Sequence, residues 1–235
     1  MTESNTERVI QAIQDELRKR LLASGDHAHD FEHLRRVSVT AETLLNDAPE
    51  ARREVVRIAA WMHDFVVVPK SDPRRSQASQ LSAEASLAFL ETLPGADPTL
   101  GGWLTGELRE AIGHAIEAHS YSAGIEPKTL EAAIVQDADR LDGVGAIGIA
   151  RCFWVGGALG RPLYCADDPW ARAGRTWDDG AFTLDHFYVK LFRTVESLRT
   201  DSGRREGARR LATMQAFLDE LERELGRELG TSRNP

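Results

Sequence analysis

The sequence has few of the features that mark secreted proteins. Only two cysteines, Cys152 and Cys165, occur among its 235 residues, which excludes the dense disulfide framework of many small secreted domains. The first residues, MTESNTERVIQ, have neither the basic start nor the apolar core of a signal peptide. We therefore expect a protein of the reducing cytoplasm.

Long apolar runs and an excess of basic residues are also lacking. The longest apolar segment, residues 146–160, is interrupted by Arg151, so we expect no membrane span. The formal net charge is -8. Because phosphate backbones and anionic lipids select basic surfaces, this charge argues against binding to a nucleic-acid polymer or a membrane. A small polyanionic substrate would need a locally positive pocket, which a metal ion can provide.

The sequence does contain a succession of amphipathic helical patterns separated by short loops. Its length suits one large domain, which we predict over residues 1–235. One helix is expected over residues 76–93, followed by a loop that begins at Pro94. We divide the predicted domain into a metal-site core (about 26–145), an irregular flap that could cover substrate (161–184) and C-terminal helices (185–229).

The apolar helical run at residues 59–62 ends in the adjacent pair His63 and Asp64. An imidazole and a carboxylate at the end of a buried helix are costly to bury unless a charge or hydrogen bonds satisfy them. A divalent cation would satisfy both groups. A salt-bridged pair at a helix terminus is the simpler interpretation, so the choice depends on further ligands elsewhere in the chain.

The richest source of histidine is residues 27–33. His29 and His33 are four positions apart and could face one centre on a helix, with His33 favoured because buried apolar positions follow it. Residues 29–33 (HDFEH) also match H-x-x-E-H, a zinc-peptidase pattern in which Glu32 would be the base. The residues alone leave both interpretations open.

Carboxylates follow a second buried helix. Asp137, Asp139 and Asp142 come directly after an apolar run, as His63 and Asp64 do, so this stretch could supply an oxygen ligand or form an acidic surface turn. His119 is expected where a helix ends facing the site. His114, five positions earlier, is offset by about 140° and is expected to be packed or exposed elsewhere.

The combined pattern resembles the HD-domain superfamily of metal-dependent phosphohydrolases over nearly the whole chain, and most of all a bacterial branch of it. The strings that carry the resemblance are residues 28–37 (AHDFEHLRRV), 62–64 (MHD), 119–122 (HSYS), 135–141 (VQDADRL), 145–151 (GAIGIAR) and 185–187 (DHF). The resemblance implies an all-α helical bundle. It also implies four metal ligands: His33, His63, Asp64 and Asp137. Because His29 is then not a ligand, the zinc-peptidase interpretation is set aside.

Two imidazoles and two carboxylates suit Mn²⁺, Mg²⁺, Fe²⁺ or a similar divalent ion. Such an ion keeps open positions for a water and a phosphate oxygen. Relatives in the superfamily act on nucleotides, so the expected reaction is hydrolysis of a phosphate ester or anhydride, with a nucleotide as the expected substrate.

Asp64 could orient or deprotonate the water. Candidates for phosphate contact or leaving-group protonation are Lys70, His119, Arg140 and Lys190. Two alternatives remain: a non-catalytic module that senses nucleotide or metal, and a di-iron oxygenase of the HD type drawing on His114 and His119. The last helix is expected to pack in the chain or to form a homodimer.

Overall fold

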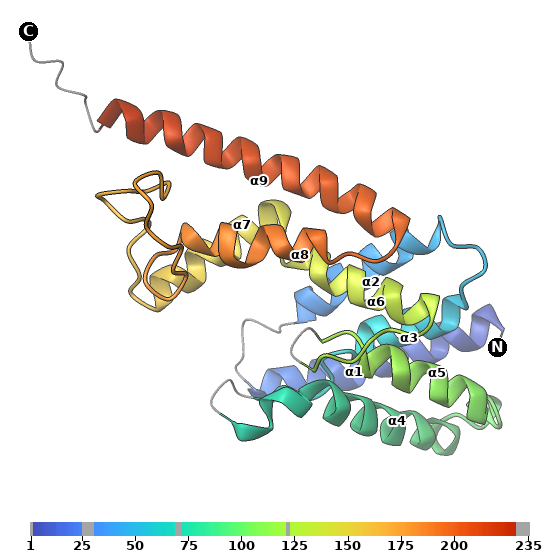
Figure 1. Cartoon of the computed structure of the whole chain (residues 1–235). Coiled ribbons are helices and arrows are strands. Elements are labelled where there is room, and N and C mark those ends of the chain that lie inside the picture. The colour runs from blue at the N-terminus through green and yellow to red at the C-terminus, as the bar shows by residue number, and fades with distance from the viewer. Residues whose placement is uncertain (1, 25–30, 69–71, 121–122, 229–235) are drawn as a thin grey trace, which may run out of the picture. The chain divides into compact units, whose positions relative to one another are not determined.

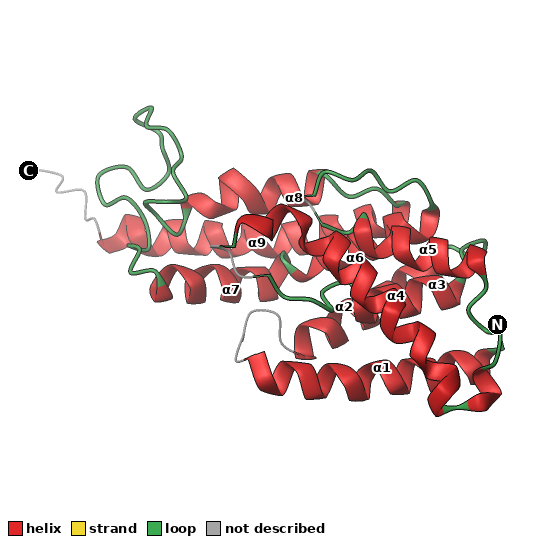
Figure 2. Ribbon diagram, turned by 90° about the horizontal axis from the view of Figure 1, so that it is seen from below, coloured by secondary structure: helices red, strands yellow, loops and turns green. Residues whose placement is uncertain are grey.

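The computed structural model describes residues 2–24, 31–68, 72–120 and 123–228. Every regular element in these ranges is a helix (Figure 1, Figure 2), which confirms the predicted all-α fold class. Within the same ranges, no helix has both the length and the apolar character needed to cross a membrane.

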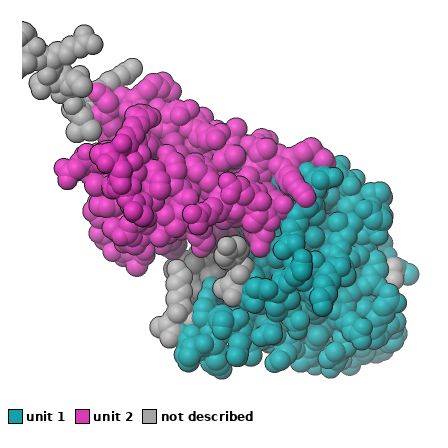
Figure 3. Space-filling model, viewed as in Figure 1, with its two compact units in different colours: residues 1–139, 199–203 teal, residues 140–198, 204–235 magenta. Residues whose placement is uncertain are grey.

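The chain separates into two compact units (Figure 3). The first contains Met1–Asp139 and Arg199–Gly203, and the second contains Arg140–Leu198 and Arg204–Pro235. The single domain predicted over residues 1–235 stays a prediction, because compactness within each unit does not decide whether they fold together.

The first unit is a bundle whose helices come mainly from the first half of the chain. Its helices are α1 (Glu3–Ser24), α2 (Phe31–Leu45), α3 (Arg53–Met62), α4 (Ala78–Ala96), α5 (Gly106–Glu117) and α6 (Leu130–Asp142), of which α6 ends in the second unit. Two short 3-10 helices, Pro73–Gln77 and Pro98–Leu100, precede and follow α4.

Helix α3 lies at the centre of this bundle and contacts α1, α2, α4 and α5. Seven of its ten residues are buried and apolar, so the helix is covered almost all round. The guanidinium of Arg57 on this helix pairs with Glu3 and Glu7 of α1, at 2.7 and 2.5 Å, and with Glu42 of α2. The residues that follow α3 therefore emerge from the middle of the core.

Helix α4 extends beyond its predicted end. The sequence predicted a loop from Pro94, but Pro94 lies inside α4, which continues to Ala96. A proline has no N–H to donate to the carbonyl four residues earlier, so this turn lacks one hydrogen bond, and only two residues of the helix follow it. The turn is still closed, because Asp97 N donates to Leu93 O at 2.8 Å.

Helix α6 is tied to the neighbouring helices through polar groups at both ends of its first-unit part. The carboxylate of Glu131 accepts a hydrogen bond from Arg52 N at 3.0 Å, at the start of α3. The amide of Gln136 donates to Ala118 O at 2.6 Å, at the end of α5. These two hydrogen bonds hold α6 against the start of α3 and the end of α5.

The second unit consists of α7 (Gly145–Ala158), a π-helix (Phe187–Leu191), α8 (Phe192–Glu196) and most of α9 (Asp201–Glu228). Its core contains Phe153, Phe187 and Phe217, whose ring centroids lie 5.6–6.1 Å apart. Residues 161–184 contain no helix or strand, as the sequence predicted for this segment.

Candidate metal centre

His63 and Asp64 lie directly after α3, so the helix at the centre of the bundle delivers them. The His63 ring is fully buried, and its Nδ1 lies 2.8 Å from Ala60 O. Because a carbonyl oxygen can only accept, Nδ1 carries the proton, and the lone pair of the neutral ring is on Nε2. This backbone contact fixes both the ring orientation and the nitrogen offered to a metal.

A second imidazole meets this nitrogen from α2. His33 is the third residue of α2 and is buried, and its Nε2 lies 3.2 Å from Nε2 of His63. Two imidazole nitrogens this close need either a shared proton or a cation between them. The rings cross nearly edge to face, with an interplanar angle of 70°, so both nitrogens point toward one region.

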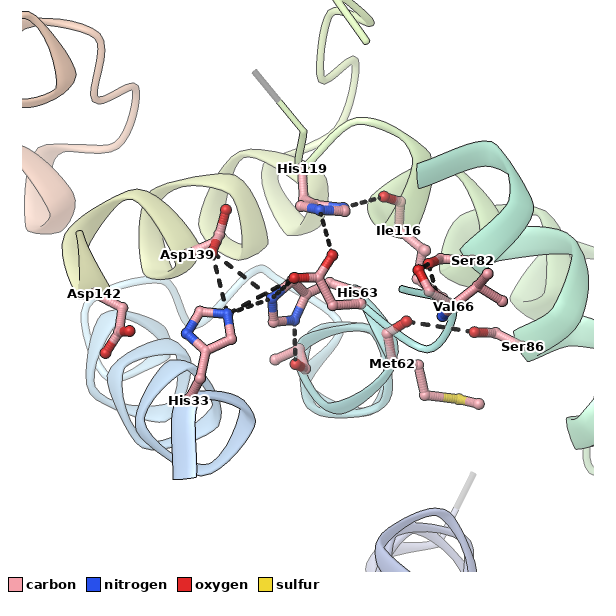
Figure 4. A network of polar contacts seen from close by, with 12 residues as sticks. His33, Met62, His63, Val66, Ser82, Ser86, Ile116, His119, Asp139 and Asp142 are labelled. Atoms are coloured by element: carbon pink, nitrogen blue, oxygen red, sulfur yellow. Dashed lines mark hydrogen bonds and ion pairs between the residues drawn. The ribbon is translucent and has the colours of Figure 1, made fainter. Parts of the chain in front are cut away.

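Two carboxylates complete the cluster, of which Figure 4 labels Asp139. Asp64 Oδ2 lies 3.9 Å from Nε2 of His33 and 3.8 Å from Nε2 of His63. Asp139 Oδ1, from α6, lies 3.6 and 3.7 Å from the same two nitrogens. His33, His63 and Asp64 each offer a ligand atom, and these atoms all lie within 4.8 Å of one another.

The spacings among the ligand atoms of His33, His63 and Asp64 fit a single divalent ion, and Asp139 Oδ1 adjoins this group through the two histidines. Ligand atoms at about 2.1 Å from a six-coordinate ion lie about 3.0 Å apart when adjacent and about 4.2 Å apart when opposite. The distances from the two nitrogens to each other and to the carboxylates run from 3.2 to 3.9 Å, within that span. Two nitrogen and two oxygen donors without a thiolate are also the donor set that Mn²⁺, Fe²⁺ or Mg²⁺ accepts.

Asp137, the predicted fourth ligand, does not join this cluster. It is fully buried, and its carboxylate accepts hydrogen bonds from the backbone N–H groups of Arg199, at 2.9 Å, and Thr200, at 2.7 Å. The Thr200 hydroxyl also donates to it at 2.7 Å. Two positions along a helix turn a side chain by about 200°, so Asp137 and Asp139 face opposite ways.

His119 borders the cluster at the end of α5. Its Nε2 lies 3.6 Å from Asp64 Oδ1, and its Nδ1 lies 2.6 Å from Ile116 O (Figure 4). Burial lowers the pKa of His119, but the adjacent carboxylates of Asp64 and Asp139 outweigh it, so the net pKa is raised. In contrast, burial dominates at His63 and lowers its pKa to about 4 despite the same two carboxylates.

The structure does not test the other predicted phosphate contacts, Lys70, Arg140 and Lys190, at this cluster. Lys70 lies outside the described residues. Arg140 belongs to the second unit, where its Nη1 donates to Ser197 O at 2.7 Å. Lys190 is exposed on the π-helix of the second unit. Their roles in substrate binding stay predictions.

The ligands required by the alternative sites are placed differently. His114 Nε2 accepts a hydrogen bond from Lys128 N at 2.8 Å, so this nitrogen has a backbone partner. A di-iron site was expected to draw on His114 and His119. Of these two histidines, His119 borders the cluster. For the zinc-peptidase pattern, His29 lies outside the described residues, and Glu32 is exposed and accepts from Arg35 Nε at 2.8 Å.

Sequence reasoning missed Asp139 as the acid at this centre. It named the right stretch, since Asp137, Asp139 and Asp142 were all considered, but the helical phase that selects between them depends on tertiary packing. Asp142 is also engaged elsewhere, because its Oδ2 accepts from Arg151 Nη1 at 3.0 Å. The burial pattern could not have separated them, because Asp137 and Asp142 are buried whereas Asp139 is partly exposed.

Comparison with known proteins identifies the family to which the residues around this cluster belong. The family model of the HD domain matches residues 30–143, which include all four side chains of the cluster and His119. The uncharacterized protein YpgQ of Bacillus subtilis is 30% identical over 209 residues, covering 87% of this chain and 88% of YpgQ.

Solved structures resemble this chain over nearly its full length. The crystal structure of Bacillus subtilis YpgQ in complex with ADP has a TM-score of 0.66 at 28% identity, covering 94% of this chain and 95% of that one. An HD-superfamily hydrolase from Bacillus thuringiensis has a TM-score of 0.66 at 27% identity, covering 95% and 98%. From its sequence, its fold and the matched residues, this chain belongs to the HD-domain superfamily of hydrolases.

Proposed function

We propose that this protein is a metal-dependent phosphohydrolase that cleaves a phosphate ester or anhydride, with a nucleotide as substrate. The observation that carries the proposal is the convergence of the two Nε2 atoms, 3.2 Å apart, on the carboxylates of Asp64 and Asp139. The choice of a nucleotide is supported by the relative YpgQ, whose structure contains ADP.

The ligands we propose are His33, His63, Asp64 and Asp139. Asp139 replaces Asp137, because the carboxylate of Asp137 is occupied by two backbone N–H groups and a hydroxyl. Both imidazoles and both carboxylates come from helix starts or ends that the core packing fixes, and such fixed side chains lose little freedom when they bind an ion.

A bound divalent ion would supply a water of lowered pKa and would neutralise charge on the phosphate. The chain itself would hold the remaining groups in place. Asp64 presents Oδ2 to the two histidines and Oδ1 to His119, so it could both bind the ion and accept a proton. His119 carries a raised pKa and is oriented by Ile116 O, which suits a proton donor to the leaving group.

The proposal is tested by incubating the Mn²⁺-loaded protein with a panel of nucleoside mono-, di- and triphosphates. Phosphate and pyrophosphate are measured separately, which also identifies the bond that is cleaved. We expect release from at least one nucleotide by the wild-type protein and none by His63→Ala.

A panel without any release from the wild type would contradict the proposal and favour a non-catalytic sensing module. Equal release from His63→Ala would show that the hydrolysis does not occur at this centre. Two metal ions per chain by elemental analysis would instead favour the di-iron alternative.

A further inference from the structure

Three serines lie on the buried face of α4, where apolar residues are usual. Ser79, Ser82 and Ser86 are each at most 1% exposed. A hydroxyl costs free energy when it is removed from water without a hydrogen-bond partner. The contribution of each serine therefore depends on the contacts of its hydroxyl.

The Ser82 hydroxyl makes two hydrogen bonds to one residue of the turn that follows the metal-centre doublet. It accepts from Val66 N at 3.1 Å and donates to Val66 O at 3.2 Å (Figure 4). The Ser86 hydroxyl donates to Met62 O at 3.4 Å, a longer contact. Helix α4 therefore holds the backbone on both sides of His63 and Asp64, more firmly on the Asp64 side.

Other contacts hold the residues on either side of Val66. Val68 is buried, and its O accepts from Arg75 Nη1 at 2.9 Å. Phe65 is buried against Phe89, with ring centroids 5.6 Å apart. On the outer side, residues 66–68 line an open hollow of about 470 Å³ together with Leu81, Ala85 and Ala88. The two-point contact with Ser82 restrains the peptide orientation at Val66 itself.

Asp64 is sensitive to the orientation of this turn. It lies two residues before Val66, and its carboxylate faces His33 and His63 through Oδ2 and His119 through Oδ1. A rotation of the turn would move both oxygens away from these nitrogens together. His63 is held independently, through its Nδ1 contact with Ala60 O.

We propose that Ser82 is a positioning residue of the metal centre, which orients the Asp64 carboxylate by holding the backbone of Val66. This inference rests on the proposed function, because it assumes that Asp64 binds the ion. Groups that orient metal ligands without touching the metal typically contribute about 10- to 100-fold in metal affinity.

The test compares Ser82→Ala with Ser79→Ala. Both serines lie on α4 and are 1% exposed, but the Ser79 hydroxyl has no hydrogen-bond partner in the described structure, which makes it a matched control. The probe is Co²⁺ alone, titrated by calorimetry, with the visible absorption of bound Co²⁺ as a readout of ligand geometry. Urea unfolding of the metal-free proteins separates a loss of stability from a loss of metal affinity.

We expect Ser82→Ala to bind Co²⁺ about 10- to 100-fold more weakly, with a changed absorption spectrum, and Ser79→Ala to match the wild type. Ser82→Cys keeps the approximate volume but hydrogen-bonds weakly, so it should also lose affinity even if the alanine variant does not fold.

Wild-type affinity in Ser82→Ala or Ser82→Cys would overturn the inference, and so would an equal loss in Ser79→Ala. In each of those cases the proposed function still stands, because the wild type binds the ion. If the wild type itself binds no Co²⁺, the proposed metal centre fails and this inference fails with it.

Discussion

Asp137 and Asp139 lie two positions apart on α6 and face opposite ways, so they have different surroundings. Asp139 faces two imidazoles. Asp137 is fully buried and accepts backbone N–H groups just before α9 begins at Asp201. Negative charge at that position is favourable, because the N–H groups at a helix start lack partners within the helix. The role of Asp137 is therefore to fix the start of α9.

This role predicts the effect of Asp137→Asn. An amide keeps the shape but replaces one acceptor oxygen by an NH₂ group, which would face the N–H groups of Arg199 or Thr200. We expect the free energy of unfolding to fall by about 1–3 kcal/mol, measured by urea unfolding. An unchanged unfolding midpoint would contradict the anchoring role.

The two cysteines should differ in reactivity. Cys152 is buried and burial raises the pKa of its thiol to about 11, whereas Cys165 is partly exposed. Since the thiolate is the reactive form, iodoacetamide at pH 8 should modify Cys165 in the native protein and Cys152 only after unfolding. Mass spectrometry of peptides from the treated protein checks this; rapid native labelling of Cys152 would show that its surroundings open readily.

At the residue scale, the grouping of His33 with His63 and Asp64 was predicted from the resemblance to the HD-domain superfamily, which implies these residues as metal ligands. The sequence did not allow the choice between Asp137 and Asp139. Both follow the same apolar run, and only the packing of α6 against the bundle decides which of the two carboxylates faces the histidines. The positioning role of Ser82 could not be predicted either, since a buried serine has no distinctive sequence pattern.

Among the elements, α7 offers a paired test of packing. A Cβ at Gly156 would lie 2.3 Å from Thr183 Oγ1, whereas a Cβ at Gly157 would meet nothing within 4 Å. We expect Gly156→Ala to destabilise the second unit by about 1–3 kcal/mol through overpacking. Gly157→Ala should stabilise it by about 0.5–1 kcal/mol, because alanine favours the helix.

Urea unfolding of both variants, monitored by tryptophan fluorescence, provides the measurement. Equal changes in the free energy of unfolding for the two substitutions would contradict the close contact between α7 and Thr183.

The irregular segment 161–184 is anchored within the second unit by an ion pair between the partly exposed Arg175 and the buried Asp185. The carboxylate of Asp185 is fully buried and binds both terminal nitrogens of Arg175, at 2.6 and 2.8 Å. It also accepts from Asp178 N at 2.7 Å. The role of this segment as a flap over substrate stays a prediction.

Removing Arg175 should loosen the segment. Arg175→Ala leaves the Asp185 carboxylate buried without its cation, which costs about 3–5 kcal/mol for a buried pair. The control is Arg172→Ala, whose exposed pair with Glu222 is worth at most about 1 kcal/mol. Limited digestion with chymotrypsin should cut residues 161–184 faster in Arg175→Ala than in the control; equal rates would argue against the anchor.

At the element scale, amphipathic periodicity was sufficient to predict that the chain is helical, and the irregular segment was also predictable from its composition. The boundaries were less so. Pro94 was taken as a helix end, yet it occupies the last turn of α4. The C-terminal helices were expected from residue 185 onward, but Phe187–Leu191 form a π-helix, whose angular spacing differs from that of an α-helix. A local widening of this kind depends on packing around Phe187.

On the scale of the whole molecule, the all-α class and the HD superfamily follow from the complete pattern of ligands and helices. A cluster assembled from α2, the end of α3 and α6 joins residues more than 100 positions apart, and its parts become recognisable only when they are considered together. The substrate is not fixed by this pattern, because the candidate phosphate contacts belong to the second unit or lie outside the described residues.

The measurement that tests the metal centre most directly is the shift of the thermal unfolding midpoint on adding Mn²⁺. A ligand at 100 times its Kd stabilises the folded state by about 2.7 kcal/mol, which corresponds to about 5–10 °C for a chain of this size. We expect this shift for the wild type and for Asp137→Asn, whose metal-free midpoint is lower, and no shift for Asp139→Asn. A full shift in Asp139→Asn together with its loss in Asp137→Asn would contradict the site described here.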